Sequence, residues 1–267
     1  MDNQAISREL ERHLRPYAER LQLEWQINYL KHPESGFAAR SNSAERSHEL
    51  YYDHGYVARA LSNSSLGQFT PSNPEALGSL IHELCHLYLG EKVDVAFSGR
   101  RLSKKHDDDG KDLDRKLGIF QLLDAPTIDM WVNDILFKNW PDIADARMAK
   151  YLENYKEYAL AGAPEVLLTT TIFFKLAQVQ ADRNRHGMKN IDFSGILDPL
   201  RTSYPLQYDA LGRFRGHLEK LPTLPSKKDE ALTLYQSSVN DSMKVMGVAD
   251  VKARLIEEDG VQVWAFD

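Results

Sequence analysis

Residues 79–90, SLIHELCHLYLG, constrain the fold of this chain more than any other stretch, because they place three polar side chains in an apolar run. His82, Glu83 and His86 stand among leucine and isoleucine residues of the kind that form a protein core. Burying a polar group without a hydrogen-bond partner is costly, roughly 1–3 kcal/mol by mutational measures. Either these side chains have a partner that compensates them, or the segment is exposed.

The same segment carries the signals of a helix over about residues 74–89. Ser72 or Asn73 can cap it, and Pro74 suits its first position, where a missing N–H leaves no acceptor unpaired. Gly90 is expected to end the helix.

On such a helix His82 and His86 project from one face, one turn apart, which is the geometry a zinc ion needs from two of its ligands. Glu83 is rotated by about a third of a turn, close enough to hold a metal-bound water without being a ligand. Zinc lowers the pKa of that water to about 7, and a neighbouring carboxylate can take its proton during attack on a carbonyl. The pattern therefore predicts a zinc site at His82 and His86, with Glu83 as general base.

The stretch LIHELCHL resembles the active-site helix of the zincin metallopeptidases. The resemblance implies that both histidines bind zinc and that Glu83 is catalytic. Metzincins continue with Gly and His at fixed offsets, where this chain has Leu89 and Lys92, so that subgroup is excluded.

Zincins of the gluzincin type take their third ligand from a later helix, and Asp129 with Asn133 is similar to that arrangement, with Asp in place of the commoner Glu. The stretch is similar to gluzincin-like bacterial metallopeptidases and, more loosely, to proteases of the ImmA/IrrE type. One of the two side chains can bind metal while the other orients a histidine. Asp124 and His106 remain alternatives for the third ligand. Asp134 lies about 140° round the helix from Asp129, so these two side chains cannot bind the same ion.

Further residues have roles that the sequence leaves open. A zinc peptidase needs a donor for the developing oxyanion, and four side chains are candidates: Tyr151, Tyr155, Tyr158 and His186. Cys85 is the single cysteine, which excludes an internal disulfide and a thiol-cluster metal site, and we expect it to pack in the core.

The pattern along the chain predicts an α+β, zincin-like fold with a small mixed sheet packed on the active-site helix, followed by a mainly helical part. Residues 1–221 are expected to form the metallopeptidase domain, and residues 222–267 either a separate unit or the end of the same core. Helices are predicted at 4–22 (broken at Pro16), 124–140, 144–160, 163–185 and 227–245; strands at 23–30, 36–43 and 54–62; strand and loop at 47–54; a charged loop at 98–117; and a hairpin turn at Asp259 and Gly260.

Charge and hydropathy exclude several classes of protein. A net charge of −6 weighs against a nucleic-acid-binding protein, which usually has a basic surplus. No run reaches the 18 or more apolar residues of a membrane span, and the first 21 residues contain no apolar signal core, so we expect a cytoplasmic protein.

These features together predict a zinc-dependent endopeptidase that acts on an intracellular protein or peptide substrate. The resemblance to zincins implies that the substrate pairs, in extended form, with an edge strand beside the helix. The alternatives are a regulatory or binding protein with a zincin fold and little turnover, and a SprT-like protease of DNA–protein crosslinks. The negative charge and the single cysteine, which rules out a zinc ribbon, count against the latter.

Overall fold

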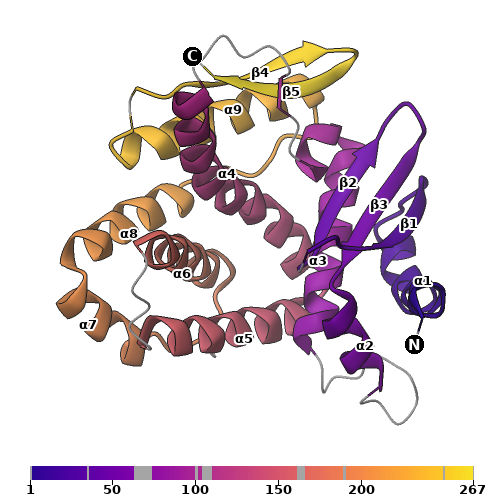
Figure 1. Ribbon diagram of the computed structural model, residues 1–267, viewed down its shortest axis with the longest axis horizontal. Coiled ribbons are helices and arrows are strands. Elements are labelled where there is room, and N and C mark those ends of the chain that lie inside the picture. Colours follow the sequence, from indigo (N-terminus) through magenta and orange to yellow (C-terminus); the bar gives the residue numbers. More distant parts are fainter. Residues whose placement is uncertain are drawn as a thin grey trace.

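The computed structural model describes residues 2–34, 36–62, 74–99, 102–103, 110–160, 166–188, 191–248 and 250–266. The fold is α+β and mostly helical, with a three-stranded sheet near the N-terminus and a two-stranded sheet at the C-terminal end (Figure 1). The elements follow in the order α1 (Asn3–Arg20), β1 (Gln26–Lys31), β2 (Ala38–Asn42), β3 (Ser47–Tyr52), α2 (His54–Ser62), α3 (Pro74–Lys92), the 3₁₀-helix η1 (Val95–Ser98), α4 (Gly110–Asn139), α5 (Pro141–Leu160), α6 (Val166–His186), α7 (Ser194–Ser203), α8 (Pro205–Leu218), α9 (Lys228–Val245), β4 (Ala253–Glu258) and β5 (Val261–Phe266).

The N-terminal sheet has the strand order β1-β3-β2, with β1 parallel and β2 antiparallel to the central strand β3. In β3 the side chains of His48, Leu50 and Tyr52 are buried, and those between them are less so, as expected for a strand with one face on the core. Helix α3 contacts both β2 and β3. The predicted small mixed sheet packed on this helix is therefore confirmed.

The prediction of a strand over residues 54–62 is wrong, because this segment is helix α2. The Asp53 side chain accepts a hydrogen bond from the backbone N–H of Tyr56 at 2.7 Å, and the Asp53 carbonyl accepts one from Val57. Asp53 thus satisfies N–H groups that a helix start leaves unpaired. This capping signal outweighs a short alternation of apolar and polar residues.

Two expected helix boundaries also differ from the structure. Helix α1 continues through Pro16 to Arg20 rather than breaking. The proline removes the hydrogen bond to the carbonyl of Arg12, but that residue is exposed, so water can take the place of the missing donor. Helix α3 continues past Gly90 to Lys92.

The loop predicted over residues 98–117 is wrong from Gly110 onward, where α4 begins. Phe120, three residues after Leu117, is fully buried, so the apolar spacing of the later part of α4 extends into this charged stretch. Lys116 is also buried. Residues 104–109, which include His106, lie outside the described part of the chain.

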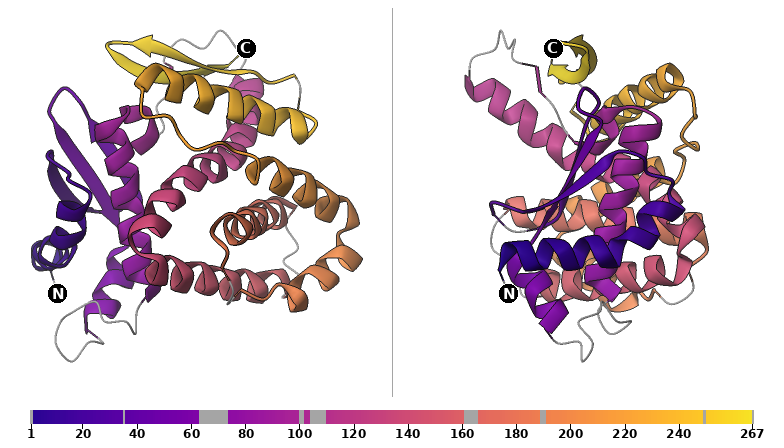
Figure 2. Two further views of the ribbon diagram at one scale, coloured as in Figure 1. Left: turned by 180° about the vertical axis from the view of Figure 1, so that it is seen from behind. Right: turned by 90° about the vertical axis from the view of Figure 1, so that its right-hand side faces the viewer.

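Helix α4 is the central element of the helical part and contacts α3, α5, α6 and α9. Figures 1 and 2 show it crossing the molecule from the C-terminal hairpin to α3. The helices predicted at 124–140, 144–160 and 227–245 correspond to α4, α5 and α9. Residues 166–185 of the helix predicted at 163–185 belong to α6, and residues 163–165 lie outside the described part of the chain. Helices α7 and α8 fill a stretch for which the sequence pattern made no prediction.

The C-terminal hairpin is confirmed, with Asp259 and Gly260 at its turn. Both residues have positive φ, 52° and 76°, as a two-residue turn of this kind requires. Trp264 of β5 is buried against Phe120 of α4 and Tyr235 of α9. The division at residue 221 stays a prediction. Each described helix is too short or too polar to span a membrane.

Candidate metal centre

Helix α3 presents His82 and His86 from one face. The centroids of the two rings lie 4.9 Å apart, and the planes of the rings are nearly perpendicular. His82 is only 3% exposed, so its polar atoms need partners within the protein.

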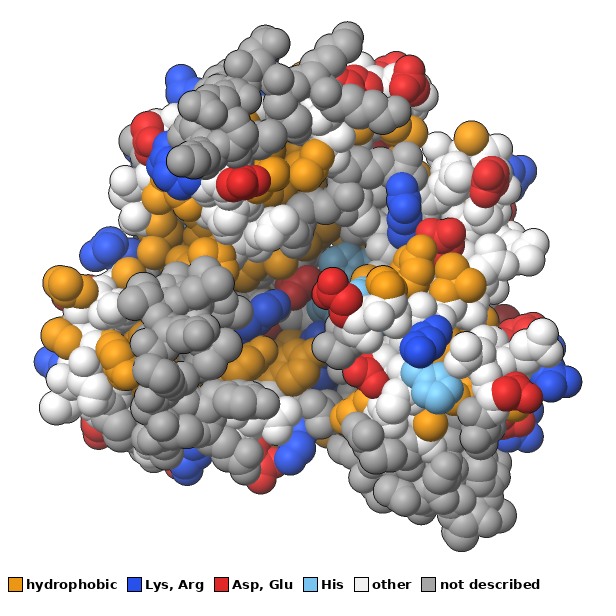
Figure 3. Space-filling view, in the orientation of Figure 1, with side chains coloured by type: hydrophobic (Ala, Val, Ile, Leu, Met, Phe, Trp, Pro, Cys, Tyr) orange, Lys and Arg blue, Asp and Glu red, His pale blue; other side chains and the backbone are white. Residues whose placement is uncertain are grey.

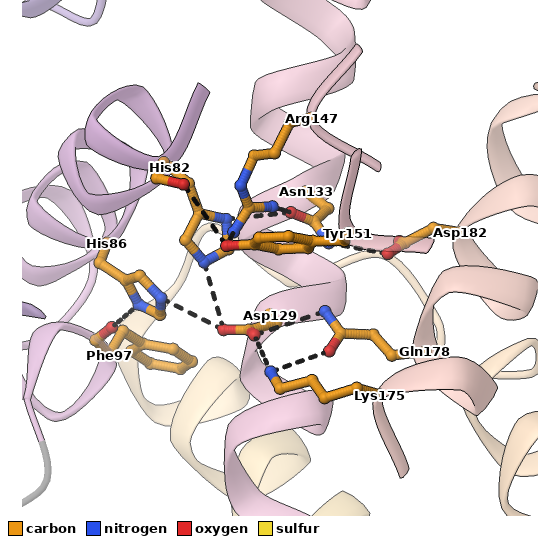
Figure 4. A network of polar contacts seen from close by, with 11 residues as sticks. His82, His86, Phe97, Asp129, Asn133, Arg147, Tyr151, Lys175, Gln178 and Asp182 are labelled. Atoms are coloured by element: carbon orange, nitrogen blue, oxygen red, sulfur yellow. Dashed lines mark hydrogen bonds and ion pairs between the residues drawn. The ribbon is translucent and has the colours of Figure 1, made fainter. Parts of the chain in front are cut away.

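Asp129 of α4 is the residue that meets both histidines (Figure 4). Its Oδ1 atom lies 3.4 Å from Nε2 of His82 and 3.3 Å from Nε2 of His86. One ligand atom from each of the three residues lies within 4.8 Å of the others. Two nitrogen or oxygen ligands of a tetrahedral zinc ion, each about 2.0–2.1 Å from it, lie about 3.4 Å apart, so the spacing of Asp129 from each histidine fits such an ion.

The second ring nitrogen of each histidine has its own acceptor. Nδ1 of His82 lies 3.0 Å from Oδ1 of Asn133, and Nδ1 of His86 lies 2.9 Å from the carbonyl oxygen of Phe97. Because both acceptors are oxygens, each Nδ1 carries the proton in the neutral imidazole, and Nε2 of the neutral ring has the lone pair. Both lone pairs therefore remain for a metal ion, and Asn133 makes the orienting contact that its spacing from Asp129 predicted.

Asn133 is held in turn by two residues that the sequence analysis missed. Its Nδ2 donates to Oδ2 of Asp182 on α6 at 2.8 Å, and Nη1 of Arg147 on α5 donates to its Oδ1 at 3.4 Å. Asp182 is fully buried, and this burial raises its pKa well above the ordinary value. The pair fixes the amide orientation, so that Oδ1 faces His82.

Asp129 has a second set of partners on its other oxygen. Nζ of Lys175 donates to Oδ2 at 3.1 Å, and Nε2 of Gln178 donates to the same atom at 3.4 Å. Burial opposes ionisation of Asp129, but Lys175 and the histidines outweigh it and hold its pKa well below the ordinary value. Lys175 is the only charged residue in the apolar stretch 166–179, which is a signal that the sequence analysis did not use.

The charges of the remaining groups follow from their surroundings. Burial, with the charge of Arg147, lowers the pKa of His82 to about 3, so this ring is neutral at physiological pH. Burial also lowers the pKa of His86, but hydrogen bonding and charge from Asp129 and the charge of Glu83 outweigh it and raise the pKa. Burial raises the pKa of Glu83, which favours a role in accepting and releasing a proton.

His82, Glu83, His86 and Asp129 line a cavity of about 460 Å³, together with Arg147 and Lys175. His82, Glu83 and His86 lie on the α3 wall, and Ala38 and Ala39 of strand β2 form part of another wall. Figure 3 shows the hollow in this face of the molecule, with histidine, acidic and basic side chains inside it and hydrophobic surface around it.

No significant match was found among known protein families, curated proteins or solved structures. What this chain does must therefore be argued from the geometry of the cavity and from the residues that line it.

The structure separates the rival ligands from the cluster. Asp134 pairs with Arg185, with two nitrogen–oxygen distances of 2.6 Å. Asp124 lines the same cavity, but it accepts a hydrogen bond from the hydroxyl of Tyr235 and does not belong to the metal-binding group found among the described residues. Asp129 is therefore the third residue of the cluster.

The structure also distinguishes among the candidates for an oxyanion donor. Tyr151 and Tyr155 line the cavity, whereas His186 does not and stacks on Phe137. The side chain of Tyr158 lies outside the described part of the chain. Cys85 is fully buried, and burial raises the pKa of its thiol, which agrees with packing in the core. His82, His86 and Asp129 thus form a buried cluster that can hold a metal ion.

Proposed function

We propose that this chain is a zinc-dependent endopeptidase of zincin type, which hydrolyses peptide bonds of an intracellular protein with Glu83 as general base. The observation that carries the proposal is the convergence of three ligand atoms, from His82, His86 and Asp129, in a cavity that Glu83 also lines. Two imidazoles and one carboxylate are the ligand set of hydrolytic zinc sites that keep a position open for water or substrate.

The protein residues have distinct roles in this proposal. Zinc, when bound, supplies a Lewis acid that polarises the scissile carbonyl and activates water. Glu83 accepts the proton of the attacking water and delivers it to the leaving amine, and its raised pKa makes it a better base than an exposed glutamate. Asn133 and the carbonyl of Phe97 keep both imidazoles in the tautomer that binds metal.

The position of strand β2 favours a peptide substrate over a small molecule. It is the last strand of the sheet, so one of its edges has no partner strand among the described residues, and its Ala38 and Ala39 line the cavity. An extended peptide can hydrogen-bond along such an edge and place one carbonyl beside the histidines.

Tyr151 is the residue that we assign to the developing oxyanion. Its hydroxyl oxygen accepts a hydrogen bond from Nη2 of Arg147 at 3.1 Å, and the Arg147 guanidinium carbon lies 4.5 Å from the centre of its ring. A hydroxyl that accepts from a cation keeps its own proton to donate and becomes the stronger donor.

The first test is the metal content of the purified, untagged protein by inductively coupled plasma mass spectrometry. We expect about one zinc ion per chain in the wild type, lost in His86→Ala and in Asp129→Ala. Asp142→Ala, on the exposed surface of α5, is the control and should keep the metal. Zinc retained in Asp129→Ala would move the third ligand elsewhere, and a wild type that takes up no metal would overturn the proposal.

The second test separates metal binding from catalysis. Glu83→Gln should keep its zinc and lose cleavage of an unfolded protein such as casein by a factor of about 10²–10⁴, because the general base is gone. Equal cleavage by Glu83→Gln and wild type would contradict the assigned role. A wild type that binds zinc but cleaves nothing would favour the regulatory or binding protein instead.

A further inference from the structure

The cavity has a division of charge that the proposed mechanism does not use. Both of its cationic lining residues, Arg147 and Lys175, come from α5 and α6, whereas its carboxylates come from α3 and α4. Figure 4 shows Lys175 and Arg147 on the side of Asp129 and Asn133, away from His86. A cation in a cavity, where water is limited, favours a ligand of opposite charge.

Lys175 keeps a hydrogen-bond donor for a ligand. Its ammonium group has three N–H donors. Within the described part of the chain two of them are used, toward Asp129 at 3.1 Å and Gln178 at 3.2 Å. The side chain is 29% exposed and lines the cavity, so its remaining donor is accessible to a molecule bound there.

Tyr155 supplies a second donor beside it. Its side chain lines the cavity from α5, and among the described residues its hydroxyl has no hydrogen-bond partner. Tyr155 and Lys175 line the same cavity from two helices, α5 and α6, that pack against each other. A phenol that reaches the cavity without a protein partner can donate to an oxygen of a ligand.

A bound metal ion strengthens the case for an anion. Asp129 is the only carboxylate that pairs with Lys175 within the described residues. A divalent ion held by Oδ1 of Asp129 would draw on the same negative charge, and this would leave the ammonium group less compensated. A carboxylate of the substrate would restore the balance and would accept hydrogen bonds from both Lys175 and Tyr155.

We propose that Lys175 and Tyr155 form a carboxylate-binding subsite beside the metal cluster, and that the substrate bears a carboxylate next to the scissile bond. The carboxylate comes either from an acidic side chain, as in a substrate of the proposed endopeptidase, or from the end of the substrate chain, in which case the enzyme is a carboxypeptidase. This subsite would define the substrate class of the proposed peptidase, and to that extent it rests on the proposed function. Binding of a carboxylate can nevertheless be measured without cleavage.

The test uses two matched pairs of peptides on the full-length, zinc-loaded protein, in a Glu83→Gln background that prevents turnover. The first pair is acetyl-Leu-Glu-amide and acetyl-Leu-Gln-amide, and the second is acetyl-Leu-Ala as the free acid and as the amide. Dissociation constants are measured by isothermal titration calorimetry. We expect at least one acid to bind about tenfold or more tightly than its amide, and the pair that shows the preference identifies the source of the carboxylate.

Two variants and one control test whether the preference depends on Lys175 and Tyr155. Lys175→Met should reduce the ratio of acid to amide affinity to near unity, and Tyr155→Phe should lower it about three- to tenfold while keeping the ring. The ratio also cancels any change in zinc affinity that follows from the loss of Lys175 beside Asp129. Lys150→Met, which removes a partly exposed lysine paired with Glu153, is the control and should leave the ratio unchanged.

The outcomes distinguish this subsite from the proposed function. Equal affinity for acid and amide, no saturable binding of either acid, or a preference that survives both Lys175→Met and Tyr155→Phe would overturn the subsite. Acid preference in a protein whose wild type cleaves no peptide would contradict the peptidase and leave the subsite standing. Zinc binding and cleavage without acid preference would support the peptidase and overturn the subsite.

Discussion

At the scale of single residues, the candidate site depends on the hydrogen-bond acceptor of Nδ1 in each histidine. Nδ1 of His82 is held by an amide and Nδ1 of His86 by a backbone carbonyl. The backbone contact to Phe97 survives most substitutions, whereas the contact to Asn133 depends on one side chain. Side-chain substitutions at Asn133 of α4 should therefore affect His82 more than substitutions at Phe97 of η1 affect His86.

We predict that Asn133→Ala lowers zinc affinity by about 10- to 100-fold, because His82 loses the acceptor that fixes its tautomer and ring orientation. The measurement is competition for zinc with a chromophoric chelator. Asn139→Ala is the matched control on the same helix, since within the described residues its amide donates only to the backbone carbonyl of Ile135. Unchanged affinity in Asn133→Ala would show that Asn133 does not position the ligand.

At the scale of elements, α3 is held against the sheet and η1 by a close approach at Gly90. A Cβ atom at this position would lie 2.3 Å from Oγ of Ser98 and 2.5 Å from Oγ of Ser41. No real Cβ makes such contacts, so the glycine allows β2 and η1 to approach α3. Both elements contribute cavity walls, and the spacing between them and the histidines depends on this contact.

Gly90→Ala should therefore destabilise the protein by about 1–3 kcal/mol, because the added methyl group overpacks this contact. Gly212→Ala, in α8, is the matched control: nothing lies within 4 Å of its Cβ position, and we expect a gain of about 0.5–1 kcal/mol from helix propensity. Urea denaturation gives the free energy of unfolding of each variant. The interpretation fails if the two substitutions have the same effect.

At the scale of the whole molecule, the C-terminal residues complete the wall of the cavity. Tyr235 of α9 lines it, stacks on Phe97 and donates a hydrogen bond to Asp124. The indole N–H of Trp131 donates to the carbonyl oxygen of Pro222 at 2.9 Å. The segment after residue 221 therefore packs on the same core as the cluster of His82, His86 and Asp129.

We predict that a chain ending at residue 221 does not fold stably, since it would expose Phe97, Phe120 and Trp131, each at most 1% exposed in the full chain. The measurements are near-ultraviolet circular dichroism and urea unfolding, with the full-length chain as reference. A cooperative transition in the truncated chain would instead support a separate metallopeptidase domain over residues 1–221.

Local patterns in the sequence determined most of the elements and half of the candidate site. The four-residue spacing of His82 and His86 needs only a helix to bring both rings to one face, and the apolar periodicity around them ensures that helix. Apolar periodicity and turn residues also predicted the later helices α5, α6 and α9 and the turn at Asp259 and Gly260, whereas the resemblance to gluzincins pointed to Asp129 and Asn133. Prediction failed where a local signal was misread, as at Asp53, whose side chain caps α2.

Tertiary structure alone decided which residues from distant parts of the chain surround that cluster. Asp129 and Asp124 are both acidic residues of one helix, and only the packing of α4 against α3 and α6 determines which of them meets the histidines. Arg147, Lys175 and Asp182 come from helices whose sequences give no sign of the surface they face. Their distances depend on interhelical packing, which involves contacts among many residues far apart in sequence, whereas spacing along one helix depends only on its regular geometry.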